Sequence, residues 1–174
     1  MLTHLSKLLD NQSMADVTFI VKNEKISAHS VIVVSVSPVI CAMLEKGKFK
    51  EGVTKEVKID DINPLVFKEM LRYLYTGTAP KLNEDAMTEP LLLAADKYQI
   101  KGLMDLCEQS LIKKLKMQMI FHFLVVAYLH SAPQLKEASL KFLVSHKREV
   151  WIRSEWRELT KTYSLKNFPF FHGK

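Results

Sequence analysis

The chain has 174 residues, of which 48% are hydrophobic, and a formal net charge of +6. This length suits one ordinary domain, or one domain with a small helical appendage. No window approaches the roughly 20 consecutive apolar residues that a membrane-spanning helix needs, and the N-terminus lacks the pattern of a secretory signal. The sequence therefore predicts a soluble, intracellular protein and argues against a membrane partner.

The positive charge is concentrated in the last third of the chain. Residues 1–110 carry 13 basic and 15 acidic side chains, a net charge of −2, whereas residues 111–174 carry 12 basic and 4 acidic side chains, a net charge of +8. A polybasic segment can bind nucleic acid or an acidic protein surface. Because these basic residues alternate with apolar positions at helical spacing, a solvated helix face is the preferred interpretation, and nucleic-acid binding is kept as a third alternative.

The first elements are a helix and a hairpin. Leucines at three- and four-residue steps predict a short amphipathic helix over residues 1–10. Alternating apolar residues predict a strand over Asp16–Val21, and Lys25–Ala28 is its predicted hairpin partner. The next run, Val31–Val36, is rich in β-branched residues, so propensity alone favours a strand there.

Two helix starts of the same type follow. Ser37 before Pro38 predicts an N-cap and a first-turn proline, with a helix to about Leu44. The glycines and charges of residues 45–56 predict an exposed loop. Asn63 before Pro64 repeats the helix start after a short strand over residues 57–59. The helix it opens is expected to bury Val66, Phe67, Met70, Leu71 and Leu74, to leave Lys68, Glu69 and Arg72 in water, and to end at Gly77.

The remainder is predicted to be helical. Residues 91–111 are expected to form two helices joined near Gln99, with Pro90 in the first turn. A strongly apolar segment over 117–129 precedes Ser131, the predicted N-cap of an amphipathic helix over 135–144. A weaker helix is expected over 150–163. The change in pattern places a domain boundary near Ser110.

The residues that carry most enzyme chemistry do not form a recognised pattern. None of the six histidines pairs with another at the spacing of a helical metal site, and no phosphate-binding glycine loop, dinucleotide fingerprint or GxSxG motif occurs. Cys41 and Cys107 lie in apolar helical patterns and are interpreted as buried free thiols. The sequence therefore predicts no catalytic residue, no metal, no cofactor and no enzymatic activity.

Several segments together resemble the BTB/POZ domain, particularly that of the speckle-type MATH-BTB proteins. They are ADVTFIV, KISAHSVIVVSVSPVICAML, VKIDDINPLVFKEMLRYLYTG and LLLAADKYQIKGLMDLCEQSL. A weaker resemblance to the BACK region continues through LHSAPQLKEASLKFLVSH. The resemblance implies a mixed α/β fold with a BTB/POZ domain over 1–110, in which helices largely cover a small sheet, and a partial, all-helical BACK-like region over 111–174. It also implies a helix at Val31–Val36 and a place in the nucleus, the cytoplasm or both.

The resemblance implies self-association through the N-terminal helix. Met1, Leu5, Leu8 and Ile32 match apolar positions that speckle-type BTB domains bury across a two-fold dimer interface. Exposed leucines on a terminal helix are costly unless they are covered, so the physical expectation agrees. The alternative is that this helix folds back onto its own domain.

The resemblance also implies a partner. Phe49 and Glu51 match the motif with which BTB adaptors bind a cullin-3-type scaffold of an E3 ubiquitin ligase, Phe49 as an apolar anchor and Glu51 as a hydrogen-bond acceptor. The alternatives are a packing role for Phe49 within its own loop, and a BTB dimer that serves transcriptional or scaffold assembly without a cullin. The chain begins at the predicted dimer helix and does not itself include a substrate-recruiting MATH domain. Either the natural protein continues before Met1, or it lacks that domain and competes by pairing with full-length adaptors.

Two further positions are weighed against the family pattern. His29, in the Ala28–His29 turn, is expected to have a structural role beside the dimer interface. Asp16 matches an aspartate that lies near a basic residue in many BTB domains, but this chain has Ser30 there, and Val36 where the family has an arginine. The pocket at the dimer seam is therefore expected to be less charged. The loop over 83–90 is expected to be about two residues longer than usual, and no role is assigned to the Phe-rich end of the chain.

Overall fold

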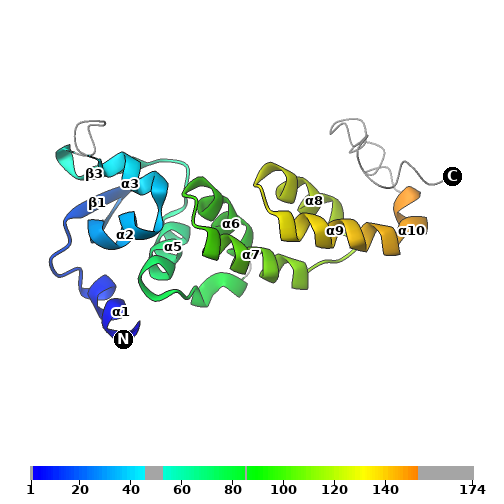
Figure 1. The fold of residues 1–174 in the computed structure, drawn as a ribbon, viewed down its shortest axis with the longest axis horizontal. Coiled ribbons are helices and arrows are strands. Elements are labelled where there is room, and N and C mark those ends of the chain that lie inside the picture. The colour runs from blue at the N-terminus through cyan, green and yellow to red at the C-terminus, as the bar shows by residue number, and fades with distance from the viewer. Residues whose placement is uncertain (1, 46–52, 85, 153–174) are drawn as a thin grey trace. The chain divides into compact units, whose positions relative to one another are not determined.

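The structure is a computed structural model that describes residues 2–45, 53–84 and 86–152 (Figure 1). Contacts divide the chain into two compact units, Met1–Ser110 and Leu111–Lys174, and each is considered by itself. The first unit combines a small sheet with several helices, which confirms the predicted mixed α/β fold. The second unit is helical throughout its described residues.

The sheet of the first unit has three strands among the described residues, in the order β2-β1-β3. β1 (Val17–Val21) and β2 (Glu24–Ala28) form the predicted antiparallel hairpin, with Phe19 opposite Ile26. β3 (Glu56–Ile59) pairs with β1 in parallel. Alternate side chains of each strand are buried, which is the pattern expected when one face of a sheet covers the core.

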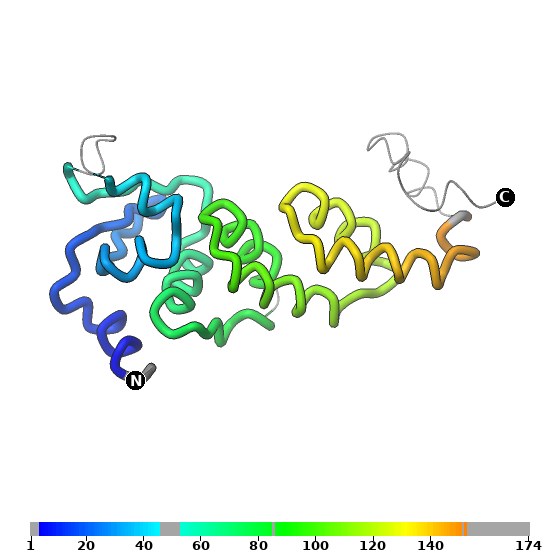
Figure 2. The backbone as a smooth tube through the Cα atoms, viewed as in Figure 1, coloured from blue at the N-terminus to red at the C-terminus, as the bar shows by residue number. Residues whose placement is uncertain are grey.

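Helices make up most of the first unit. Figure 2 traces the path of the chain through them in the order of the sequence. They are α1 (Leu2–Asn11), α2 (Ser30–Val36), α3 (Pro38–Leu44), α5 (Pro64–Thr76), the 3₁₀ helix η1 (Pro80–Asn83), α6 (Thr88–Lys97) and α7 (Lys101–Lys113), the last of which crosses the division between the units.

α5 forms as its sequence predicts, with one correction. The Asn63 side-chain oxygen accepts from the Leu65 N–H at 2.9 Å, and Gly77 ends the helix in the left-handed conformation with φ 67°. The predicted apolar face is buried. Glu69, however, was expected in water and is only 3% exposed, because its carboxylate turns inward and accepts the Lys81 N–H at 2.7 Å. Glu69 therefore caps η1.

The β-branched segment before Pro38 is helical, as the family resemblance implied. α2 ends at Val36, and α3 begins one residue after Ser37. The Ser37 hydroxyl oxygen accepts from the Ile40 N–H at 3.2 Å and donates to the Tyr98 carbonyl at 2.7 Å. One fully buried hydroxyl thus caps α3 and ties it to the end of α6. α2 is helical in spite of its strand propensity, with Val33 buried in the core.

The second unit contains α8 (Ile120–Leu129), α9 (Pro133–Ser145) and α10 (Lys147–Trp151). Its core joins residues from all three helices: Ile120, Phe121, Leu124, Leu143 and Val150. The N-cap prediction at Ser131 was wrong, because Ala132 occupies that position and Ser131 has φ 48°. α10 begins earlier than the predicted helix over 150–163, and residues 153–163 lie outside the described residues.

One other expectation is corrected. Cys41 was predicted to be buried, but it is exposed on α3; Cys107 is buried, and burial with a smaller contribution from Glu108 raises the pKa of its thiol to about 12. Pro90 lies in the first turn of α6, as predicted, and the greater length of the 83–90 loop relative to the family stays a prediction. Within the described ranges, no helix is long and apolar enough to cross a membrane.

Candidate protein-interaction site

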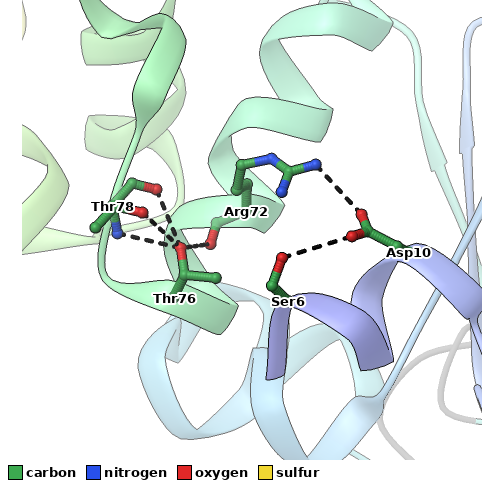
Figure 3. Close-up of polar contacts among 5 residues, drawn as sticks. All are labelled: Ser6, Asp10, Arg72, Thr76 and Thr78. Atoms are coloured by element: carbon green, nitrogen blue, oxygen red, sulfur yellow. Dashed lines mark hydrogen bonds and ion pairs between the residues drawn. The ribbon is translucent and has the colours of Figure 1, made fainter. Parts of the chain in front are cut away.

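The N-terminal helix lies against its own domain. Asp10 of α1 forms an ion pair with the Arg72 guanidinium of α5, with 3.4 Å between Oδ1 and Nη2, and Ser6 lies one turn earlier on the same side of α1 (Figure 3). Leu9 and Leu71 line a hollow of about 190 Å³ beside this ion pair. One turn further along α5, the Thr76 hydroxyl donates to the Arg72 backbone carbonyl at 2.7 Å (Figure 3). α1 is therefore anchored to α5.

The predicted dimer residues are placed as follows. Leu5 and Leu8 of α1 are half-buried, and so is Ile32 of α2; Met1 lies outside the described residues. The attachment of α1 to α5 leaves part of each leucine in contact with solvent. The helix thus folds onto its own domain, as the alternative held, and still carries apolar surface that a second molecule can cover.

Sequence reasoning missed two exposed apolar side chains in this region. Val31, which precedes Ile32 on α2, is 72% exposed, and Met14, in the connection from α1 to β1, is 90% exposed. The sequence held a signal for Val31, because Val31 stands at the outward position of a helix whose Val33 is buried. Met14 has no comparable signal, since it lies outside the predicted helix and strand; its backbone is left-handed, with φ 62°.

His29 has the structural role that was expected. Its Nε2 lies 2.7 Å from the Ser13 carbonyl, which only accepts, so Nε2 carries the ring proton and Nδ1 accepts from the Tyr75 hydroxyl at 2.7 Å. The His29 backbone N–H donates to the same hydroxyl oxygen at 2.8 Å. Burial raises the pKa of Tyr75, with smaller effects of the His29 bond, which lowers it, and of Asp16. The turn before α2 is thereby fixed to α5.

Asp16 contacts the residue that replaces the family's basic side chain. Its two carboxylate oxygens accept from the Ser30 N–H at 2.6 Å and the Ser30 hydroxyl at 2.5 Å, so Asp16 caps the start of α2. Desolvation opposes ionisation, but the Ser30 hydrogen bonds and the nearby Lys55 together lower the pKa of the carboxyl. Both oxygens of the Asp16 carboxylate therefore have hydrogen-bond donors within the chain.

The predicted cullin-binding residues, Phe49 and Glu51, lie outside the described residues. The described residues on the two sides of this segment are held in place by different contacts. Leu44, at the end of α3, is buried, and the Lys55 carbonyl accepts the Thr18 N–H of β1 at 2.9 Å. Between them, Val53 is 76% exposed.

The polar contacts at Asp10, Asp16 and His29 each join separate segments of the first unit and hold them in place. Over the described ranges, no group of three or more His, Cys, Asp and Glu side chains is placed to hold a metal ion.

Comparison with known proteins identifies the fold family. The family model of the BTB/POZ domain matches residues 5–115. The chain belongs to the BTB/POZ family. Among curated relatives from Mus musculus, TD and POZ domain-containing protein 2 is 38% identical over 169 residues, which are 97% of this chain and 46% of that protein. TD and POZ domain-containing protein 1 is 37% identical over 159 residues, 91% of this chain and 43% of that protein.

This BTB/POZ chain thus spans less than half the length of the curated relatives it matches. The family places it among protein-interaction modules, which agrees with the half-buried leucines of α1 and the exposed Val31 of α2. The narrower resemblance to the speckle-type branch and the BACK-like character of residues 111–174 stay predictions. The relatives' names carry TD and POZ and do not decide either point.

Proposed function

We propose that this BTB/POZ chain is a dimeric adaptor that binds a cullin-3-type scaffold in an E3 ubiquitin ligase complex. The observation that carries the proposal is the partly exposed leucine side of α1, which remains after α1 has been anchored to α5 through Asp10 and Arg72. Apolar surface of this kind usually marks an interaction site. The ligase chemistry itself resides in other subunits.

The proposed dimer is symmetric. In an isologous interface the same patch is used twice, so Leu5 and Leu8 of one molecule face the equivalent surface of the second. Ile32 completes the patch, as the family resemblance implies, and Met1 extends it at the N-terminus. Val31, directly before Ile32, adds apolar area that the sequence had not indicated.

The proposed cullin contact is separate from the dimer surface. Phe49 enters an apolar pocket of the scaffold, and Glu51 accepts hydrogen bonds from it. Support comes from the BTB/POZ family and from the position of the motif between α3 and β3, both of which are anchored. The α8–α9 pair is proposed to be the start of a BACK-like region that lengthens this contact.

The test is a pull-down of a cullin-3-type scaffold by the wild type, by Phe49→Ala and by Val53→Ala. Truncating a central aromatic anchor is expected to weaken binding by about tenfold or more. Val53→Ala is the matched control, because it removes an exposed apolar side chain from the same connection and is expected to change little. Both variants should remain dimers.

Full cullin binding by Phe49→Ala would remove Phe49 from the interface. A wild type that dimerises but does not bind the scaffold would favour the other assignment, in which the BTB dimer serves transcriptional or scaffold assembly or pairs with full-length adaptors. The two outcomes are distinguishable because the dimer residues and the cullin residues do not overlap.

A further inference from the structure

The second unit carries an apolar surface that the proposed function does not use. α8, with the sequence IFHFLVVAYL, is hydrophobic nearly all round, whereas a surface helix normally has one polar side. Its inner side, with Ile120, Phe121 and Leu124, forms the core. Its outer side consists of His122, Val125, Tyr128 and Leu129, here called the α8 face.

The α8 face is open to solvent where it is largest. Tyr128 and Leu129 are each 57% exposed, His122 is exposed and Val125 is half-buried. The four positions follow helical spacing, so they form one continuous strip rather than scattered contacts. A strip of this kind is expected to be covered by another element.

The α8 face has a lysine beside it and belongs to a basic unit. Lys136 of α9 places its Nζ 5.6 Å from the centroid of the Tyr128 ring, a distance typical of a cation–π contact. Residues 111–152 contain seven Lys and Arg but only two acidic side chains, Glu137 and Glu149. Glu137 is bound to Lys141 at 2.7 Å. Apolar contact is therefore available beside Lys136, in a unit whose described residues carry a net positive charge.

We propose that the α8 face binds an amphipathic helical segment of a partner protein whose apolar side is flanked by Asp and Glu. Such a segment would cover Tyr128 and Leu129 with its apolar side, place a carboxylate near Lys136 and be attracted by the net positive charge of the unit. The site is independent of the N-terminal dimer helix and of Phe49.

The net charge of the second unit favours an acidic partner over two other molecules or segments that could cover the α8 face. A second copy of the chain would bring its own residues 111–174, with a net charge of +8, against those of the first copy, and the two like charges would repel. The chain's own residues 153–174 contain five basic and two acidic side chains, a net charge of +3, and are opposed for the same reason. An acidic partner is the occupant that the charge of this region attracts.

The experiment measures fluorescence anisotropy of two labelled model peptides with the full chain. Both are amphipathic helices of about 18 residues, long enough to form a helix on binding, with the same leucine positions. One carries glutamates beside the leucines and the other carries lysines. The glutamate peptide is expected to bind about tenfold tighter or better, and this preference should shrink between about 50 mM and 300 mM salt.

Variants locate the binding on the α8 face. The double variant Tyr128→Ser, Leu129→Ser should weaken binding of the glutamate peptide by about tenfold, because it removes the exposed apolar contacts without adding charge. Leu65→Ser is the matched control, since Leu65 is an exposed helical leucine of α5 in the first unit, 58% exposed. Lys136→Glu should shift the preference toward the lysine peptide.

Four results would overturn the proposal: absence of saturable binding, equal binding of the two peptides, an equal loss on Leu65→Ser, or unchanged binding by the double variant. Self-association of the wild type that the double variant abolishes would assign the α8 face to a second copy and would also overturn it. Circular dichroism of each variant establishes that the helices are retained.

Discussion

α5 and α8 both contribute to the core of their unit, yet their remaining surfaces differ. α5 keeps its charged residues together, and these are used to hold neighbours: Arg72 binds Asp10, Lys68 binds Glu24 and Glu69 caps η1. α8 has almost no polar side, and its Tyr128 and Leu129 remain exposed. A helix whose polar side is occupied within its own domain acts as scaffold, whereas a helix with uncovered apolar residues is available for binding.

The largest expected effect is the loss of stability when a core side chain of α5 is removed. Phe67 of α5 is fully buried, with its ring centroid 5.0 Å from that of Phe19 and 6.4 Å from that of Tyr98. Phe67→Ala leaves a cavity between the sheet and α6 and should lower the free energy of unfolding of the first unit by about 3–5 kcal/mol. Urea denaturation followed by circular dichroism measures it.

The control for Phe67 is Leu65→Ala on the exposed side of the same helix, which should change the free energy of unfolding by less than about 0.5 kcal/mol. Equal losses for the two variants would mean that α5 does not have one buried and one exposed side.

The contrast between a buried and an exposed position can also be tested within α8. Leu124 is 3% exposed and belongs to the core of the second unit, so Leu124→Ala should cost about 2–5 kcal/mol. Leu129→Ala, on the α8 face, should cost less than about 0.5 kcal/mol. Thermal unfolding of both variants checks the difference. A large loss on Leu129→Ala would indicate that this side of α8 is already covered within the chain.

A smaller effect is expected at the polar connection between α5 and the turn before α2. Tyr75→Phe keeps the ring but removes the hydroxyl that bonds both the His29 N–H and Nδ1, so two buried groups lose their partner. The expected loss is about 1–3 kcal/mol by denaturant titration. Tyr128→Phe, at an exposed tyrosine, is the control, and a comparable loss there would argue against this role for Tyr75.

The smallest expected effect is on the stability of the fold at low pH. The hydrogen bond from Lys97 lowers the pKa of the Asp61 carboxyl below its usual value, so the folded state favours the ionised form. This stabilisation is present above the unfolded pKa, near 4, and is lost as the pH falls through the lower folded value. Asp61→Asn should therefore flatten the decline in stability below about pH 4. If the stability of Asp61→Asn declines at low pH as steeply as that of the wild type, the pair with Lys97 contributes nothing to the pH dependence.

Much of the fold was predictable because it follows short-range rules. Asn63 and Pro64 start α5 and Gly77 ends it as their residue types require, and the apolar spacing of α5 identifies its buried side. Glu69 could not be predicted as buried, because its partner, the Lys81 N–H, belongs to another element. Cys41 shows the converse, since an apolar helical pattern over seven residues does not determine which side faces solvent.

The interaction surfaces were predictable only in part. Leu5, Leu8 and Ile32 were predicted as dimer residues through the family resemblance, and this stays a prediction. The anchoring of α1 by Arg72 was not predicted, because Asp10 and Arg72 are far apart in the sequence. The α8 face escaped notice since an apolar run reads as core until a structure shows which residues its neighbours cover. Ser131 was misjudged because a serine before a proline-initiated helix resembles the N-cap that Ala132 in fact supplies.

The most direct test of the adaptor account is sedimentation equilibrium of the wild type and of the double variant Leu5→Asp, Leu8→Asp. The account predicts a wild-type dimer and a folded variant that sediments as a monomer, because two carboxylates on α1 cannot be buried in a symmetric apolar interface without a large desolvation cost. A double variant that still sediments as a dimer would contradict it.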